Sequence, residues 1–256
     1  YSLPWINGRE SSGIVVKRGS KVDKSKFPIA AEVFLASTSY RNLKTSTFQE
    51  YTVIDSRLVW NLPQCLLSNG VLCKKFDLDF AAGIGVGLVT AGAALSSIID
   101  LTVNGDYESG EKLGNLVIWG ATSSVGIYAI QLARASKRFT NIIAISSKKH
   151  ESYLRQLGAN YNIDRFQSEK IIIEKVLKLC PEGVSFGIDL VSKETATVLS
   201  KILELGSSEV KKLICVVGTP ILSTNSINFS VDSKLIIETV NIKRFHEDVD
   251  FGKHFV

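Results

Sequence analysis

The stretch Leu116–Ala133, LVIWGATSSVGIYAIQLA, carries the pattern that decides the fold of this chain. An apolar strand ends at Gly120, a short turn follows, and a helix begins with Gly126 in its first turn. The first glycine lets the chain turn tightly off the strand, and the second lets the helix lie close against a sheet. Backbone N–H groups at the start of the helix can hold a phosphate, and the helix dipole favours its negative charge. The stretch therefore predicts a dinucleotide-binding strand–turn–helix.

The side chains of this turn support the prediction but do not complete the usual fingerprint. Ser123 and Ser124 can cap the helix or donate hydroxyl groups to a phosphate. Thr122 stands where the motif G-x-G-x-x-G has its second glycine. A capped structural turn that has lost its ligand is the alternative interpretation. The predicted cofactor contacts in this turn are Gly120, Ser123, Ser124, Val125 and Gly126.

Strands and helices alternate on both sides of this turn. The predicted strands are Asn115–Trp119, Asn141–Ser146, Tyr161–Asp164, Phe186–Val191 and Lys212–Gly218. The predicted helices are Ser124–Ser136, Lys148–Leu157, Ser168–Leu179 and Lys193–Leu203. Apolar strands separated by helices of this length indicate βαβ units and a parallel sheet that is buried on both faces. We therefore predict an α/β fold with a doubly wound, Rossmann-type parallel sheet.

The end of the second predicted strand indicates which nucleotide the chain would bind. An NAD-binding domain places an acidic residue there, on the ribose 2′-OH. This chain has two hydroxyls and two cations instead, Ser146, Ser147, Lys148 and Lys149. Their charge and hydrogen bonding suit a 2′-phosphate, so the sequence favours NADP(H) over NAD(H). A solvated lysine pair in a first helical turn is the alternative. Gly218, at the end of the last predicted strand, is a further expected cofactor contact.

The first ninety residues are rich in strand signals. Gly13–Lys17 and Ala31–Ala36 are short apolar runs, and Phe48–Ile54 alternates with period two. The uncharged run Phe80–Ile99 is long enough to span a bilayer, but it contains four glycines and lacks flanking anchors. We interpret it as a small-residue helix buried between two domains, so no membrane association is expected.

Composition excludes several classes of protein. The chain has 256 residues, 45% hydrophobic and 21% charged, which is ordinary for a globular protein and excludes disordered or collagen-like chains. The net charge is +5, but no block of five or six basic residues occurs, so nucleic acid is not an expected partner. Four cysteines without a C-x-x-C pair indicate free thiols in a reducing compartment, and a cytoplasmic location is expected.

Taken together, these motifs resemble the medium-chain dehydrogenase/reductase superfamily. The resemblance covers nearly the whole chain in the order of that superfamily. It is strongest with its zinc-independent branch of quinone oxidoreductase-like and fungal toxin-cluster enoyl reductase-like proteins. The matching pieces include GRESSGIVVKRGSKV at Gly8–Val22, GATSSVGIYAIQLA at Gly120–Ala133 and FGIDLVSKETA at Phe186–Ala196.

The resemblance implies a domain organisation. Residues 1–88 would form a GroES-like, β-rich substrate domain, residues 89–244 the Rossmann domain, and residues 245–256 the start of a return to the first domain. Compared with the superfamily, both ends look clipped, and the chain contains no Met. The implied function is NADP(H)-dependent hydride transfer to a quinone, an enone or enal, or an aldehyde. A non-catalytic relative that keeps the nucleotide site and binds a partner is the alternative.

Departures from the zinc-dependent members bear on the mechanism. Arg9 stands at the position of their zinc-binding His, and a guanidinium is no metal ligand. We therefore expect no metal site. The proton donor is not evident; Tyr40 is a weak candidate. Asp189 is expected to cap the turn after its strand rather than to act as a base. The sequence leaves a monomer and a homodimer open.

Overall fold

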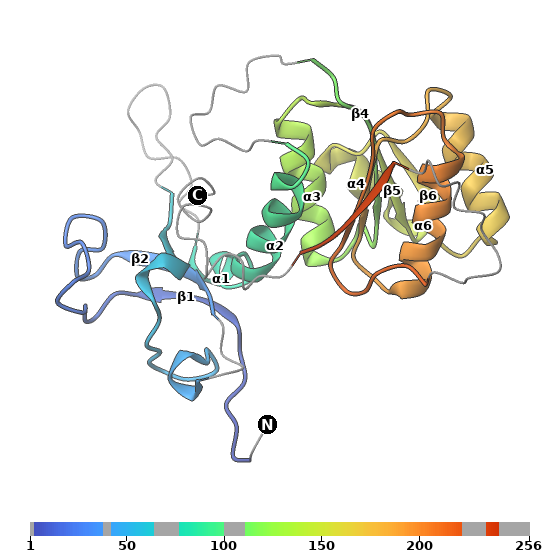
Figure 1. Cartoon of the computed structure of the whole chain (residues 1–256). Coiled ribbons are helices and arrows are strands. Elements are labelled where there is room, and N and C mark those ends of the chain that lie inside the picture. Colours follow the sequence, from blue (N-terminus) through green and yellow to red (C-terminus); the bar gives the residue numbers. More distant parts are fainter. Residues whose placement is uncertain (1–2, 38–41, 64–76, 100–110, 222–233, 241–256) are drawn as a thin grey trace. The chain divides into compact units, whose positions relative to one another are not determined.

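The computed structural model describes residues 3–37, 42–63, 77–99, 111–221 and 234–240 (Figure 1). The chain divides into two compact units, and the boundary between them falls between Val89 and Thr90. Each unit has its own sheet: three antiparallel strands in the first and six parallel strands in the second. The predicted combination of a Rossmann-type sheet with a preceding GroES-like, β-rich region is confirmed.

The parallel sheet has the strand order β6-β5-β4-β7-β8-β9. The chain enters it in the middle, at β4, runs outward through β5 to β6, and then returns to the other side of β4 with β7. This is the order of a doubly wound dinucleotide-binding fold, which changes direction between its first and fourth strands. The strands are β4 (Gly114–Trp119), β5 (Phe139–Ser146), β6 (Tyr161–Asp164), β7 (Phe186–Asp189), β8 (Lys211–Cys215) and β9 (Leu235–Thr239).

Helices cover both faces of this sheet because successive strand residues point to opposite sides. Leu116 and Ile118 of β4 belong to one buried cluster, and Val117 and Trp119 belong to the other. The first cluster takes residues from α2 (Gly85–Ser96), α3 (Ser124–Ala135) and α4 (Glu151–Leu157). The second takes residues from α5 (Glu169–Leu179) and α6 (Lys193–Leu205).

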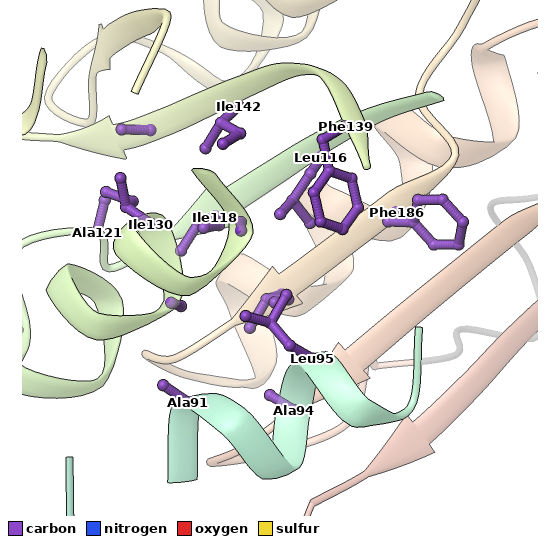
Figure 2. Packing of buried hydrophobic residues seen from close by; sticks show 14 of the residues in the cluster. Ala91, Ala94, Leu95, Leu116, Ile118, Ala121, Ile130, Phe139, Ile142 and Phe186 are labelled. Atoms are coloured by element: carbon purple, nitrogen blue, oxygen red, sulfur yellow. The ribbon is translucent and has the colours of Figure 1, made fainter. Parts of the chain in front are cut away.

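Figure 2 shows how the first cluster is packed. The side chains of Ala91, Ala94 and Leu95 project from α2, and Ile130 of α3 lies next to Ile118 of the sheet. All five are fully or almost fully buried. The small residues of the run Phe80–Ile99 thus form a helix surface in the core. No helix among the described residues is long and apolar enough to cross a membrane.

The first unit contains a short antiparallel sheet with the order β1-β2-β3. Its strands are β1 (Glu10–Ile14), β2 (Glu32–Ala36) and β3 (Val59–Asn61), and a short helix, α1 (Leu78–Ala81), follows. The Glu10 carboxylate accepts a hydrogen bond from the backbone N–H of Val86, at 2.7 Å, near the start of α2. This contact satisfies one of the donors that a helix start leaves free.

The strand predicted over Phe48–Ile54 is wrong. The stretch is irregular, and Phe48 (76% exposed) and Val53 face solvent. The segment is held instead by backbone and side-chain hydrogen bonds to the turn at residues 43–46, such as Val53 N–H to Lys44 O at 2.8 Å. Period-two alternation leads to a strand only where a neighbouring strand can pair with it through backbone hydrogen bonds. Here β3 occupies the position beside β2.

Candidate functional site

The carboxyl ends of the parallel strands meet at one edge of the larger unit. The register pairs Trp119 of β4 with Ile145 on one side and with Asp189 on the other, and Asp189 in turn with Cys215. In open α/β sheets, ligands bind outside this edge, where the strand order changes direction. That point lies between β4 and β7, so the turns that follow these strands form the candidate site.

The turn from β4 into α3 is closed by its own backbone and one side chain. Gly120 has a φ of +83°, a conformation that residues with a side chain rarely adopt. The backbone N–H of Ser123 donates to the carbonyl of Gly120 at 2.9 Å. The hydroxyl oxygen of Ser123 accepts from the backbone N–H of Gly126 at 3.1 Å and so caps α3. Ser123 thus acts as the helix cap, one of the two roles expected for it.

Both glycines of the turn are required by close packing. A Cβ on Gly126 would lie 2.6 Å from the carbonyl oxygen of Gly120 and 2.7 Å from Ala121 Cα. A Cβ on Gly120 would lie 2.7 Å from Val191 Cγ2, on the loop that follows β7. The atoms around Gly126 belong to the backbone and cannot rotate away, whereas those around Gly120 are side-chain atoms, and its positive φ is the stronger reason for a glycine there. The two glycines therefore fix the helix start against the turn, and the turn against the end of β7.

The start of α3 has the donors that a phosphate needs. Among the described residues, the backbone N–H groups of Thr122, Ser124 and Val125 have no hydrogen-bond partner. Thr122 and Ser124 are exposed, and the first turn of α3 contains no acidic residue. Free N–H groups at the positive end of a helix dipole bind anions. A pyrophosphate group fits this turn, which would supply backbone donors and nearby hydroxyls.

The turn after β5 is built differently. Ser146 is buried, and its hydroxyl donates to Asn162 Oδ1 at 2.8 Å, which ties the end of β5 to β6. Ser147 precedes a 3-10 turn, Lys148–His150, and makes no capping bond through its side chain. Lys148 and Lys149 are exposed. Of the four predicted contacts, the two lysines and Ser147 are accessible to a ligand, whereas the Ser146 hydroxyl is committed within the fold.

Two residues after β6 were missed by the sequence analysis. The backbone N–H of Arg165 donates to the carbonyl of Ser146 at 2.9 Å, which brings this loop to the end of β5. The Arg165 guanidinium lies 4.3 Å from the centre of the Phe166 ring, and both residues are exposed. An Arg directly after the predicted strand Tyr161–Asp164 was the available signal. Parallel strands end at one edge, so this Arg belongs with the lysines after β5.

The loops after β7 and β8 complete the edge. The prediction that Asp189 caps the next turn is confirmed, because its Oδ1 accepts from the backbone N–H groups of Val191 at 3.0 Å and Ser192 at 3.1 Å. Burial raises the pKa of this carboxyl above its ordinary value. Gly218 follows β8, and a Cβ on it would lie 2.6 Å from Lys193 Cγ, at the start of α6. All the predicted cofactor contacts thus lie at or just after the carboxyl ends of β4, β5 and β8, at one edge of the sheet.

Comparisons with known proteins agree with this geometry. An uncharacterized protein of Saccharomyces cerevisiae is 30% identical over 195 residues, which is 74% of this chain and 52% of that protein. The trans-enoyl reductase himH of Aspergillus japonicus is 32% identical over 163 residues, 63% of this chain and 43% of the relative. This chain spans about half the length of the curated relatives it matches. No family model matches it.

Solved structures share the fold. An alcohol dehydrogenase superfamily protein from Novosphingobium aromaticivorans aligns over 99% of this chain and 66% of its own, with a TM-score of 0.72 and 19% identity. A mycobacterial protein in complex with NADPH aligns over 100% of this chain and 69% of its own, with a TM-score of 0.72 and 16% identity. The resemblance to the medium-chain dehydrogenase/reductase superfamily is confirmed.

The position that the superfamily resemblance singled out, Arg9, lies in the first unit. Arg9, at the place of the zinc-binding His of other superfamily members, directly precedes β1 and is exposed. Within the ranges that the structure describes, no three His, Cys, Asp or Glu side chains are grouped so that they could hold a metal ion. Tyr40, the candidate proton donor, lies outside the described residues.

Proposed function

We propose that this chain is an oxidoreductase that uses NADP(H) to transfer a hydride to a quinone, an enone or enal, or an aldehyde, without zinc. The observation that carries the proposal is the Gly120–Gly126 turn. It presents unpaired backbone donors at a helix start, and it lies where the strand order changes direction. Every helix start leaves such donors, so the position of this one, at the point where the strand order changes direction, supports a nucleotide site.

The preference for NADP(H) over NAD(H) rests on the charges after β5 and β6. Lys148, Lys149 and Arg165 are exposed cations at one end of the sheet. The expected position of a ribose-binding acid, at the end of β5, is occupied by Ser146 and Ser147. Cations and hydroxyls suit a phosphate, whereas a free 2′-OH gains little from them. The mycobacterial structural relative in complex with NADPH supports the same choice.

The reaction would divide between cofactor and protein. The nicotinamide, when bound, supplies the hydride. The chain's residues hold its phosphates by backbone donors at the start of α3 and pack the end of β7 against that turn. Trans-enoyl reductases among the relatives support an activated double bond as one substrate class. Substrate contacts and the proton donor would come from other parts of the chain, and Tyr40 remains a proposal for the donor.

Independence of zinc follows from the chemistry of Arg9. A guanidinium has no lone pair to offer at neutral pH, so the zinc-binding His of other superfamily members is replaced here by a residue that cannot act as a ligand. Activity should therefore survive a chelator. One relative, from Schizosaccharomyces pombe, is named as zinc-type alcohol dehydrogenase-like and is 28% identical over 221 residues, so the point needs a direct test.

The experiment is an absorbance assay of the purified protein. NADPH is mixed with single quinones, enones, enals and aldehydes, and oxidation is followed at 340 nm with and without a chelator. We expect turnover of NADPH with at least one acceptor and no change on chelation. Activity that is abolished by the chelator and restored by zinc would contradict zinc independence. Cofactor binding without turnover of any acceptor would favour the non-catalytic alternative.

A further inference from the structure

Asp189 is a buried carboxylate that has no cation partner among the described residues. It ends β7, its exposed fraction is 0%, and the register places it between Trp119 of β4 and Cys215 of β8. Among the described residues no cation contributes to its pKa, which burial raises and which hydrogen bonds from the Thr195 side chain and the Val191 and Ser192 N–H groups lower in part. Removing a carboxylate from water without pairing it is costly. A residue that costs stability in this way needs a reason beyond the fold.

The two oxygens of Asp189 are used unequally. Oδ1 accepts both hydrogen bonds from the turn, whereas Oδ2 is buried and has no partner among the described residues. Capping the turn requires one acceptor oxygen, which an Asn would also supply. The second oxygen and the negative charge are therefore not explained by the turn. The carboxylate also acts on its neighbour Cys215. Burial, as the larger cause, and the charge of Asp189, as the smaller, raise the pKa of the Cys215 thiol to about 12.

The position of Asp189 relates this charge to one half of a dinucleotide. A doubly wound sheet consists of two mononucleotide-binding halves, and the dinucleotide lies across the point where the order changes direction. The lysines after β5 and Arg165 after β6 belong to one half, and Asp189 of β7 begins the other. The turn that it caps carries Val191, which is 42% exposed and borders Gly120 of the phosphate turn.

We propose that the charge of Asp189 makes the site favour the oxidised cofactor, whose nicotinamide ring is a cation, over the reduced cofactor, whose ring is neutral. This inference rests on the proposed function. The two forms carry the same phosphates and adenosine, so contacts in the first half of the sheet cannot distinguish them. A fixed anion in a poorly screened interior can, because charges interact more strongly there than in water. Asp189 would thus be a specificity residue for the redox state of the cofactor.

The test is a calorimetric titration of NADP+ and NADPH into the wild type, Asp189→Asn and a matched control, Asp164→Asn. Asp164 also ends a strand and caps its turn, by accepting from the Phe166 N–H at 3.2 Å, but it lies in the other half of the sheet. For Asp189→Asn we expect binding of NADP+ to weaken about tenfold relative to NADPH. Asp164→Asn should leave the ratio of the two dissociation constants unchanged.

Several outcomes would overturn the inference. Equal changes for both cofactors in Asp189→Asn would reduce Asp189 to a turn cap, with the proposed function intact. If Asp164→Asn changed the ratio of the NADP+ and NADPH dissociation constants as much as Asp189→Asn does, the effect would be one of overall charge and not of Asp189. A wild type that binds neither cofactor would remove the proposed function as well. Thermal unfolding verifies that each variant is folded, and Asp189→Ser, also neutral, carries the same comparison if Asp189→Asn is not.

Discussion

Two turns at the same edge of the sheet are built in opposite ways. The turn after β4 has no room for a Cβ at Gly126, because backbone atoms surround it, and it needs glycine at position 120, where φ is positive. The turn after β5 exposes long charged side chains, Lys148 and Lys149, on a short 3-10 turn. One presents backbone donors in a fixed shape, and the other presents charge on flexible stems.

This difference predicts how each turn responds to change. Closely packed backbone atoms leave no free space, so one added methyl group must displace the backbone itself. Charges on exposed side chains are screened by water and salt, so their removal has a smaller effect that depends on the ligand. Changes after β4 should therefore damage stability and all nucleotide binding, whereas changes after β5 should alter the choice of nucleotide.

The largest effect is expected for Gly126→Val. The new side chain would collide with the backbone of Gly120 and Ala121, so the helix start must move. We expect the free energy of unfolding to fall by about 1–3 kcal/mol. Binding of NADPH and NADH should each weaken at least about a hundredfold, or about 2.7 kcal/mol. Chemical unfolding and calorimetric titration measure the two quantities.

Gly13→Ala is the matched control for this variant. Gly13 lies in β1, and a Cβ on it would meet no atom within 4 Å. It should unfold and bind as the wild type does. If Gly126→Val is destabilised but binds both nucleotides normally, the phosphates do not lie on the β4–α3 turn, and the contrast between the two turns is lost.

A smaller, selective effect is expected for the double variant Lys148→Ala/Lys149→Ala. Both side chains are exposed, so we expect NADPH to bind about tenfold more weakly, or about 1.4 kcal/mol, and NADH to bind almost as before. Dissociation constants of the two nucleotides at two salt concentrations check this. An equal loss for NADPH and NADH would show that the lysines do not recognise a 2′-phosphate.

The smallest effect concerns Asp189, at the end of β7. Because the pKa of Asp189 is raised in the folded state, the unfolded chain loses this proton first as the pH rises. The contribution of Asp189 to the free energy of unfolding therefore decreases as the pH rises from its ordinary pKa of 3.8 to its raised pKa in the folded protein. Relative to the wild type, Asp189→Asn should gain stability as the pH rises from 3.8 towards the raised pKa of Asp189. Urea unfolding at several pH values measures the difference; a difference that shrinks over this range would contradict the assignment.

Most of the parallel sheet could be predicted from the sequence because its strands are buried on both faces. Runs such as the one at residues 142–145 are apolar and are separated by helices, a pattern with few alternatives. The edge strand Leu235–Thr239 was not predicted. Among the described residues it pairs only with β8, and exposed Ile236 and Thr239 leave it without a continuous buried pattern. The small sheet was harder still, as Phe48–Ile54 shows.

Residues of the candidate site could be predicted where a local motif or a strand end marks them. They could not be predicted where contacts between distant segments determine what a side chain does. The glycine turn and the lysine pair follow from local sequence. Arg165 could have been included by following the same rule to the next strand. The commitment of the Ser146 hydroxyl to Asn162 depends on the pairing of β5 with β6, which the sequence does not display.

The central claim is that the edge formed by β4 and β5 binds NADP(H). Its most direct test is a calorimetric titration of NADPH, and in parallel of NADH, into the purified wild-type chain. A separate melt first verifies that the chain is folded and unfolds cooperatively. The account predicts one binding site per chain and a lower dissociation constant for NADPH than for NADH. A cooperatively folded chain that releases no binding heat with either nucleotide, and whose melting temperature neither nucleotide raises, would contradict it.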